Sequence, residues 1–307
     1  QRQMCIRDSS GKVHIREGEE KIHAMMEDYE GVIIWDLPSQ IRNRYLKYCF
    51  SHSIRCYMSP KISDIILLGT DRIHLFDTPL LMCRNQGLSM EQRAAKRVLD
   101  IIVSGLGIIV SSPIMLIIAI AVKAYDGGPV FYLQDRLTYQ GKEFRIRKFR
   151  SMCVDSEKNG ARLASKHDSR ITPVGHVLRN LHLDELPQLF NVFMGDMSLV
   201  GPRPERDVIM QEYEQEIPEF HYRLKVKAGL TGYAQVYGKY NTTPYDKLKL
   251  DLFYIENYSF LLDIKLIFMT VKIFFQKEVS EGVDDRQVNA LKDSGKNAGV
   301  SENKTEE

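Results

Sequence analysis

The sequence lacks the features that mark several large classes of protein. The formal net charge over 307 residues is only +2, which gives no sign of a nucleic-acid binder. No apolar core follows a basic start, so no signal peptide is recognisable. The cysteines form no CxxC pair and no ligand spacing with histidine, which favours reduced thiols over a disulfide framework or a zinc site. They are Cys5, Cys49, Cys56, Cys83 and Cys153.

The sequence pattern divides the chain into four parts. Residues 1–10 match nothing that follows, and we interpret them as a non-native leader outside the fold. Residues 11–90 are expected to hold a small βαβ fragment and then a linker with little pattern. Residues 91–278 carry the motifs described below. Residues 279–307 are dominated by Gly, Asn, Lys and Glu, which predicts a disordered tail.

The βαβ fragment is predicted within residues 31–60. Residues 31–38 are a short run rich in β-branched side chains that ends in a proline. Residues 39–53 repeat apolar side chains at helical spacing, with Ser39 as the N-cap, and residues 54–60 are a second strand candidate. No glycine-rich phosphate loop follows the first strand, so nothing here indicates nucleotide binding. An unrelated α/β cap is the alternative.

Residues 98–122 form a long apolar run. A helix of this length extends about 37 Å, more than the ~30 Å hydrocarbon core of a bilayer. Ser112 and Pro113 interrupt the run. Proline removes a backbone donor and kinks or breaks a helix, and serine hydroxyls can satisfy the freed carbonyl groups. A kinked single crossing and a re-entrant hairpin compete, with a buried helix of a soluble protein as a third alternative.

The charges on both sides of this run favour the hairpin. Arg93, Lys96 and Arg97 precede the run, and a basic cluster from Lys123 to Arg150 follows it. Basic flanks are typical of the cytoplasmic side, and a single crossing cannot place both flanks there.

Residues 260–275 predict an interfacial amphipathic helix. The stretch is strongly apolar, yet it is interrupted by Asp263, Lys265 and Lys272, whose lysines could reach the headgroups. A helix packed in the core of a soluble domain is the alternative.

Two adjacent carboxylates, Asp184 and Glu185, are the centre of the strongest motif. Neighbouring residues on a helix point about 100° apart, so the pair divides two tasks rather than sharing one proton. A carboxylate is ionised at neutral pH and can attack a phosphoryl group. Mg²⁺ and arginines would offset the repulsion between anions. The first turn of a helix, where acids suit the helix dipole, is the structural alternative.

Basic residues accompany the acid pair along the sequence. Arg179 lies five residues before the first carboxylate, close enough to reach the same anionic ligand. Residues 201–204, Gly-Pro-Arg-Pro, form a stiff loop that presents one guanidinium. Residues 143–152 alternate as a strand would, with Lys148 and Arg150 on one face, and a solvated basic edge is the alternative.

Together these motifs resemble those of one family. They comprise Arg179, Asp184-Glu185-Leu186-Pro187-Gln188, Asn191, Gly195-Asp196-Met197-Ser198, Gly201-Pro202-Arg203-Pro204 and Lys148 to Met152. The sequence resembles the bacterial sugar transferases, monotopic phosphoglycosyl transferases that start glycan assembly on a polyprenyl phosphate. The resemblance covers about residues 93–277. It implies an α/β (α+β) membrane-associated catalytic domain with a re-entrant helical hairpin, broken at Ser112 and Pro113, and a partial Rossmann-like fragment before it.

The resemblance also implies an activity. It is transfer of a hexose-1-phosphate from a UDP-sugar to undecaprenyl phosphate, with release of UMP, at the cytoplasmic face of the bacterial inner membrane. Such a step initiates exopolysaccharide, capsule or O-antigen assembly. Asp184 would be the nucleophile and form a covalent phosphosugar intermediate, and Glu185 would be the main Mg²⁺ ligand, with Asp184 as the second. The implied substrate-binding residues are Lys148, Arg150, Arg179, Arg203, Lys227, Thr231 and Gln235.

The sequence departs from the family pattern at two positions. Ala228 stands where relatives usually carry proline, which weakens a rigid turn, and Tyr233 stands where tryptophan is common, which keeps an aromatic ring. A membrane-bound metal-dependent phosphohydrolase with water as acceptor and a non-catalytic membrane scaffold remain alternatives. The sequence also leaves open whether the chain forms a homodimer.

Overall fold

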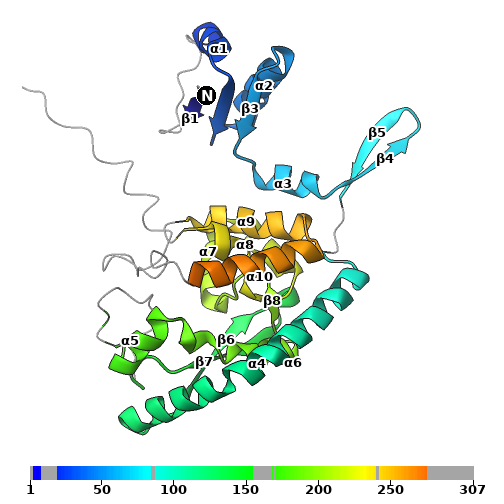
Figure 1. The fold of residues 1–307 in the computed structure, drawn as a ribbon. Coiled ribbons are helices and arrows are strands. Elements are labelled where there is room, and N and C mark those ends of the chain that lie inside the picture. The colour runs from blue at the N-terminus through cyan, green and yellow to red at the C-terminus, as the bar shows by residue number, and fades with distance from the viewer. Residues whose placement is uncertain are drawn as a thin grey trace, which may run out of the picture. The chain divides into compact units, whose positions relative to one another are not determined.

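The computed structural model describes residues 3–7, 19–83, 87–154, 168, 170–239 and 242–274. These residues belong to two compact units with a boundary after Asp64, and Figure 1 labels the elements of each. Helices and strands are mixed in both units, so the expected α/β class is confirmed. The tail predicted for residues 279–307 lies outside the described residues.

The first unit is a small parallel sheet accompanied by two helices. Its elements are β1 (Gln3–Arg7), α1 (Glu19–Glu27), β2 (Gly31–Trp35), α2 (Ser39–Ser51) and β3 (Arg55–Met58). The strand order is β1-β2-β3 and both pairings are parallel, so the predicted βαβ fragment is confirmed.

Two details of this unit differ from the sequence-based expectation. Residues 3–7, which the sequence argument left outside the fold, pair with β2 as an edge strand. Ser39 is the first residue of α2 rather than its cap. Pro38 occupies the cap position, and no side chain there accepts a hydrogen bond from the first turn.

A β-hairpin lies where the sequence predicted only a linker. The short helix α3 (Ile62–Leu68) leads into β4 (Asp71–Leu75) and β5 (Thr78–Met82), which pair antiparallel. Almost every residue of the two strands is exposed, and Thr78–Met82 shows no alternation of apolar and polar residues that would mark a strand. The turn residue Phe76 has a φ of 52°, a left-handed conformation that glycine or asparagine would normally signal.

The second unit packs short helices and two small sheets against one long helix, α4 (Met90–Asp126) (Figure 1). β6 (Phe131–Leu137) and β7 (Glu143–Phe149) form a hairpin around the turn η2 (Tyr139–Gly141), and β8 (Ser198–Val200) pairs in parallel with β9 (Gly229–Thr231). The other elements are α5 (Pro173–Asn180), η3 (Leu183–Glu185), α6 (Gln188–Met194), α7 (Asp207–Glu216), η4 (Pro218–Lys225), α8 (Tyr233–Tyr237), α9 (Pro244–Glu256) and α10 (Phe260–Phe274).

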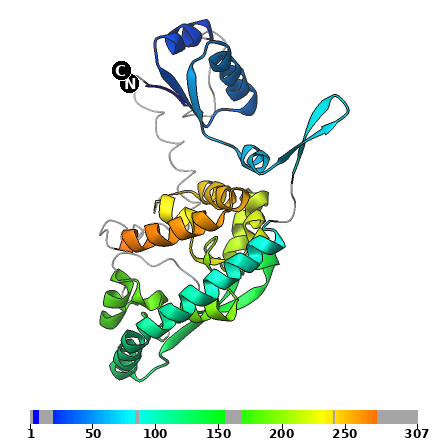
Figure 2. The same ribbon diagram turned by 45° about the vertical axis from the view of Figure 1, so that its right-hand side comes forward.

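Helix α4 continues through Pro113. Proline has no N–H to offer the carbonyl of Ile109, and the hydroxyl of Ser112 donates to that carbonyl instead, at 2.8 Å. The helix axis bends in its second half (Figure 2), as expected for an internal proline. The structure therefore shows one bent helix, and the re-entrant hairpin stays a prediction.

The outer face of α4 is apolar and exposed. Among the described residues, α4 is the one helix long and apolar enough to cross a membrane. Its inner face packs Met115, Ile118 and Val122 against Phe149 and Leu178. Eight apolar side chains on the outer face are each more than half exposed; these are Val98, Ile102, Leu106, Ile109, Val110, Leu116, Ile117 and Ile120. An exposed apolar surface of this extent is typical of a membrane or protein interface.

Buried polar contacts anchor the first half of α4. Lys96 Nζ lies 2.5 Å from Oδ2 of the fully buried Asp263 on α10. The hydroxyl of Tyr254 accepts from Lys96 and donates to Asp263 Oδ1, at 2.9 and 2.8 Å. Asp100 Oδ1 accepts from the amide of Leu199, at 2.8 Å. These contacts bind α4 to α9, α10 and β8.

Two of the cations that precede the apolar run in the sequence have partners inside the protein. Lys96 forms the ion pair just described, and Arg97 donates to the carbonyls of Val192 and Phe193 at the end of α6, both at 2.7 Å. Basic residues can bind the last carbonyls of a helix and favour its dipole. Both cations therefore have partners within the fold, and their place beside a membrane stays a prediction.

Helix α10 combines both interpretations of residues 260–275. Asp263 and Leu266 are fully buried against the rest of the unit, whereas Leu261, Phe268 and Val271 are more than half exposed. The helix is thus packed on one side and apolar on the other. Its contact with a membrane stays a prediction.

We expect Lys96→Met to lower the free energy of unfolding by about 3–5 kcal/mol, because it leaves the carboxylate of Asp263 buried without its counter-ion. Lys265→Met is the control. Its side chain is exposed on the same helix as Asp263, so its effect should stay within about 0.5 kcal/mol. Denaturant unfolding in detergent measures both, and equal losses would contradict the anchoring role of Lys96.

Candidate active site

The acid pair lies in a single 3₁₀ turn, η3, between α5 and α6. Successive residues of such a turn point about 120° apart, so Asp184 and Glu185 diverge as expected. His182, just before the turn, has a φ of 53°, a conformation that is strained for residues other than glycine and that recurs at functional sites. The pair therefore does not occupy the first turn of an α-helix, because α6 begins only at Gln188.

Two cations from distant parts of the chain meet at one oxygen of Glu185. Lys148 Nζ, on β7, lies 2.6 Å from Oε1, and Arg203 Nη2, in the loop after β8, lies 2.9 Å from the same atom. The side chains of Lys148 and Glu185 are each only 19% exposed. Burial alone would raise the pKa of Glu185, but Arg203 and Lys148 outweigh it and hold this pKa well below its usual range.

The neighbouring carboxylate is shifted in the opposite direction. Burial, followed by the negative charge of Glu185, raises the pKa of Asp184, and Lys148 and Arg179 offset only part of the rise. Two carboxylates whose pKa values are moved apart are typical of acid pairs with two separate roles. The more basic carboxylate is Asp184, the candidate nucleophile.

A hydrogen bond to Ser151, just after the end of β7, orients the side chain of Arg179. Its Nε donates to Ser151 Oγ at 2.9 Å, and its charge lowers the pKa of Asp184. The structure thus brings together three of the predicted phosphate ligands, Arg179, Lys148 and Arg203, around the acid pair. Their binding of phosphate stays a prediction.

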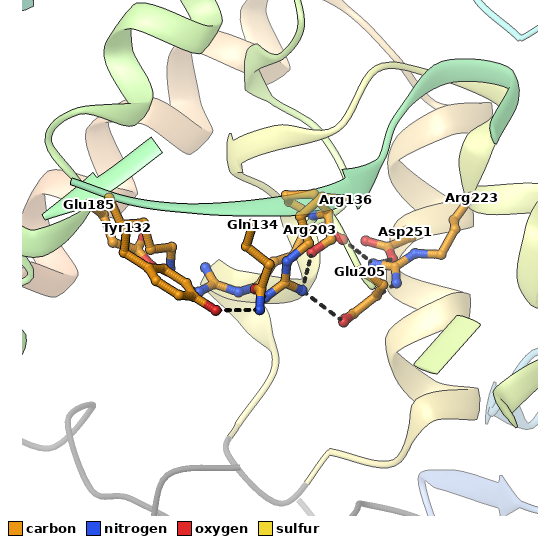
Figure 3. A network of polar contacts seen from close by, with 10 residues as sticks. Tyr132, Gln134, Arg136, Glu185, Arg203, Glu205, Arg223 and Asp251 are labelled. Carbon is orange, nitrogen blue, oxygen red and sulfur yellow. Dashed lines mark hydrogen bonds and ion pairs between the residues drawn. The ribbon is translucent and has the colours of Figure 1, made fainter. Parts of the chain in front are cut away.

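Backbone hydrogen bonds fix the loop that carries Arg203. The amide of Gly201 donates to Thr231 and the amide of Gly229 donates to Pro202, both at 2.8 Å. A Cβ added to Gly229 would lie 2.1 Å from the nitrogen of Gly201, so this close approach requires glycine. Figure 3 shows Arg203 beside Glu185 at one end of a polar network.

Among the described residues, the four other predicted substrate ligands form no hydrogen bond or ion pair with the acid pair. Thr231 Oγ1 lies 2.6 Å from Thr270 Oγ1 on α10. Arg150 is buried and pairs with Asp126 at the end of α4. Lys227 donates to the carbonyl of Gly195 at 2.7 Å. Gln235 lies on α8, and its amide nitrogen and oxygen are buried without a hydrogen-bond partner. The roles of these four residues in substrate binding stay predictions.

The alanine that departs from the family pattern has a partner of its own. The amide of Ala228 donates to Thr138 Oγ1 at 3.1 Å, a hydrogen bond that proline could not make. Tyr233 contacts Tyr237, with ring centroids 4.5 Å apart. Neither position is adjacent in sequence to the acid pair.

The acid pair fits a Mg²⁺ ion only together with oxygens of a ligand. Within the described ranges, no group of three or more His, Cys, Asp or Glu side chains could hold a metal. Mg²⁺ is commonly bound by one or two carboxylates plus substrate phosphates, and Asp184 and Glu185 supply two. Because Lys148 and Arg203 both bind Oε1 of Glu185, the atom that suits a metal is Oε2.

The pairing of four charged residues next to the Arg203 loop was not predicted from the sequence. They are Arg136, Glu205, Arg223 and Asp251, which Figure 3 shows in one network. The ion pair between Arg223 and Asp251 joins η4 to α9. No motif or periodicity reveals such pairing, because it arises only when the elements pack together.

Comparison with known proteins identifies the class. Residues 91–277 match the family described as bacterial sugar transferase, and the chain belongs to this family, as the resemblance predicted. It is 44% identical, over 232 residues, to the UDP-N-acetylgalactosamine-undecaprenyl-phosphate N-acetylgalactosaminephosphotransferase of Aeromonas hydrophila, which covers 75% of this chain and 54% of that protein.

A second relative is the UDP-glucose:undecaprenyl-phosphate glucose-1-phosphate transferase of Klebsiella pneumoniae. It is 38% identical over 262 residues, which is 82% of this chain and 54% of that protein. An enzyme of the same name from Escherichia coli (strain K12) is 40% identical over 208 residues, covering 66% of this chain and 43% of that protein. The chain thus spans about half the length of the relatives that it matches.

The opposite pKa shifts predict opposite effects of pH on stability. The lowered pKa of Glu185 stabilises the folded state above about pH 4.3, and this stabilisation is lost as the pH falls below that value. The raised pKa of Asp184 stabilises the folded state below about pH 3.9, and this stabilisation is lost as the pH rises through the folded-state pKa.

Unfolding of three proteins in detergent over a range of pH measures this difference. As the pH rises, we expect wild type to gain stability relative to Glu185→Gln and to lose stability relative to Asp184→Asn. If both differences moved in the same direction, the opposite shifts would be refuted.

Proposed function

We propose that the chain transfers a hexose-1-phosphate from a UDP-sugar to undecaprenyl phosphate and releases UMP. The observation that carries the proposal is the meeting of Lys148 and Arg203 at Glu185, beside the half-buried Asp184. Fixed cations at an acid nucleophile suit a transferred phosphoryl group, whose charge must be neutralised. The names of the relatives above, which contain a UDP-sugar or undecaprenyl phosphate, support these substrates. The step would initiate exopolysaccharide, capsule or O-antigen assembly.

The reaction proceeds by two displacements at one phosphorus. In the first, an oxygen of the Asp184 carboxylate bonds to the phosphorus that bears the sugar, the bond from that phosphorus to the bridging oxygen breaks, and UMP leaves with this oxygen. In the second, an oxygen of undecaprenyl phosphate bonds to the same phosphorus and the carboxylate leaves. Both attacking groups are anions, so neither step requires a general base.

The basic side chains reduce the repulsion between the attacking anion and the phosphate. Arg203 and Lys148 lie close enough to Glu185 to share their donors with a phosphate oxygen, and Arg179 approaches from the side of Ser151. Glu185 would hold Mg²⁺ with Asp184 as the second ligand, and the ion when bound would supply positive charge against the phosphate oxygens.

The exposed apolar face of α4 provides a reason for a membrane location. A long polyprenol stays in the bilayer, so its phosphate is available only at headgroup depth. We place the enzyme at the cytoplasmic face of the bacterial inner membrane, with α4 re-entrant around Ser112 and Pro113 and α10 in the interface. The bend of α4 and the partial exposure of α10 support this arrangement.

The kinetic order tests the covalent mechanism. Given a suitable UDP-sugar alone, the detergent-solubilised enzyme should release at most one UMP per active site and then stop until undecaprenyl phosphate is added. Asp184→Asn should remove this burst while leaving thermal unfolding in the native range. Glu185→Gln is the matched control for charge, and its burst should recover partly at high Mg²⁺.

The other outcomes separate the alternatives. Continued release of UMP without lipid would indicate a phosphohydrolase, with water as the acceptor. Release only when both substrates are present would indicate direct transfer and remove the nucleophilic role from Asp184. No release under any condition, with a panel of UDP-sugars, would favour a scaffold.

Cysteine labelling tests the topology of α4. Single cysteines replacing Glu91 and Tyr125, in a cysteine-free background, should react from the same side of sealed vesicles. Tyr125 is 52% exposed, whereas a side chain at the nearby Gly128 would collide with Arg150. Pro113→Leu should favour a crossing, because a continuous helix of this length can span the bilayer. If the cysteines that replace Glu91 and Tyr125 were labelled from opposite sides in the protein that keeps Pro113, a re-entrant α4 would be excluded.

A further inference from the structure

The loop that presents Arg203 is held from behind by two other arginines. Arg223 Nη2 donates to the carbonyl oxygen of Arg203, and Arg136 Nη1 donates to the carbonyl oxygen of Pro204, each at 3.0 Å. The two donors come from η4 and β6, and they grip successive peptide groups of one short loop. The side chain of Arg203, in contrast, is 49% exposed, and its guanidinium contacts Glu185.

Two acids neutralise these arginines on the side away from the acid pair. Glu205 lies between them, with oxygens 3.7 Å from Arg136 and 3.6 Å from Arg223. Asp251 on α9 lies 2.8 Å from Arg223 Nη2, and its side chain is only 1% exposed. Figure 3 shows the continuous network from Glu185 through Arg203 to Asp251. Burial raises the pKa of Asp251 to about 6, and the positive charge of Arg223 limits this rise.

This network of buried charges fits a role other than stabilising the fold. Buried ion pairs stabilise a fold little, since removing charges from water costs about as much as their attraction returns. A planar guanidinium can bind a carbonyl and a carboxylate simultaneously, which makes arginine suited to fixing a backbone in one direction. The loop has two prolines, whose fixed φ angles add to this rigidity.

We propose that Arg223 and Arg136 are positioning residues that hold the carbonyls of Arg203 and Pro204, and so fix the direction from which the Arg203 guanidinium meets Glu185 and the transferred phosphate. Neither arginine touches the substrate in this account, because both act through Arg203. The kinetic part of the proposal rests on the proposed function. Its structural part, the restraint of the loop, does not.

Arg223→Lys is the principal test variant. It keeps the positive charge, but Nη2 of Arg223 contacts both Asp251 and the carbonyl of Arg203 while Nη1 faces Glu205, and one ammonium cannot replace both nitrogens of this planar fork. Arg136→Lys is the second variant, which decides the question if Arg223→Lys fails to fold. Arg97→Lys is the matched control, since Arg97 also grips two successive carbonyls, on α6.

Hydrogen–deuterium exchange measures the restraint without any assay of activity. The amides of Leu137 and Gly229 donate to the carbonyls of Glu205 and Pro202, so they report directly on the loop. We expect exchange at both amides to become about tenfold faster in Arg223→Lys and in Arg136→Lys, the loss of roughly one hydrogen bond. Arg97→Lys should leave them unchanged.

A double-mutant cycle measures whether the effect acts through Arg203. The rate of the first UMP release should fall about 100-fold in Arg223→Lys, as expected when a catalytic group is misplaced. In an Arg203→Gln background the same change should cost at most about twofold. Arg97→Lys should give the same factor in both backgrounds.

Unchanged exchange at Leu137 and Gly229, or losses that multiply in the Arg203→Gln background, would overturn the proposal. If the wild type releases no UMP with any UDP-sugar, the proposed function fails, while the exchange measurement still decides whether the two arginines restrain the loop.

Discussion

The contact of Lys148 and Arg203 with one oxygen of Glu185 gives the two acids of the site different pKa values, and two separate parts of the fold position it. Lys148 reaches it because the β6–β7 hairpin aligns its strand, and Arg203 reaches it because the parallel pair β8–β9 holds the following loop. Two cations at one half-buried carboxylate lower its pKa, and the negative charge of Glu185 in turn helps to raise the pKa of Asp184. The different roles of the two acids follow from this single asymmetry.

A second constraint connects the site to the apolar helix. α4 exposes an apolar outer face, yet its first half is anchored by the pair of Lys96 with Asp263 and by Asp100 with the amide of Leu199. Leu199 belongs to β8, the strand that leads directly into the Arg203 loop. The helix that would enter the membrane and the loop that would bind phosphate are thus joined through one strand, which suits an enzyme that meets a lipid phosphate at a fixed depth.

The motifs predicted which residues would lie together, and the periodicity predicted part of the fold. Asp184, Glu185, Lys148, Arg179 and Arg203 are found together, and most predicted helices and strands are present. The β4–β5 hairpin was missed because its strands are exposed and its turn contains no glycine. The network behind Arg203 was missed for another reason: pairing of distant charges is a property of packing, and no local spacing encodes it. The same cause explains why the internal partners of Lys96 and Arg97 were not predicted.

The central claim is that Asp184 is a nucleophile made basic by burial and by the charge of Glu185. Peptide mapping by mass spectrometry, after brief incubation with a UDP-sugar and without lipid, tests it most directly. The account predicts a mass increase of one sugar phosphate on the peptide that contains Asp184, sensitive to hydroxylamine and removed by undecaprenyl phosphate. An adduct on another residue, or UMP release and lipid product without any adduct on the chain, would contradict it.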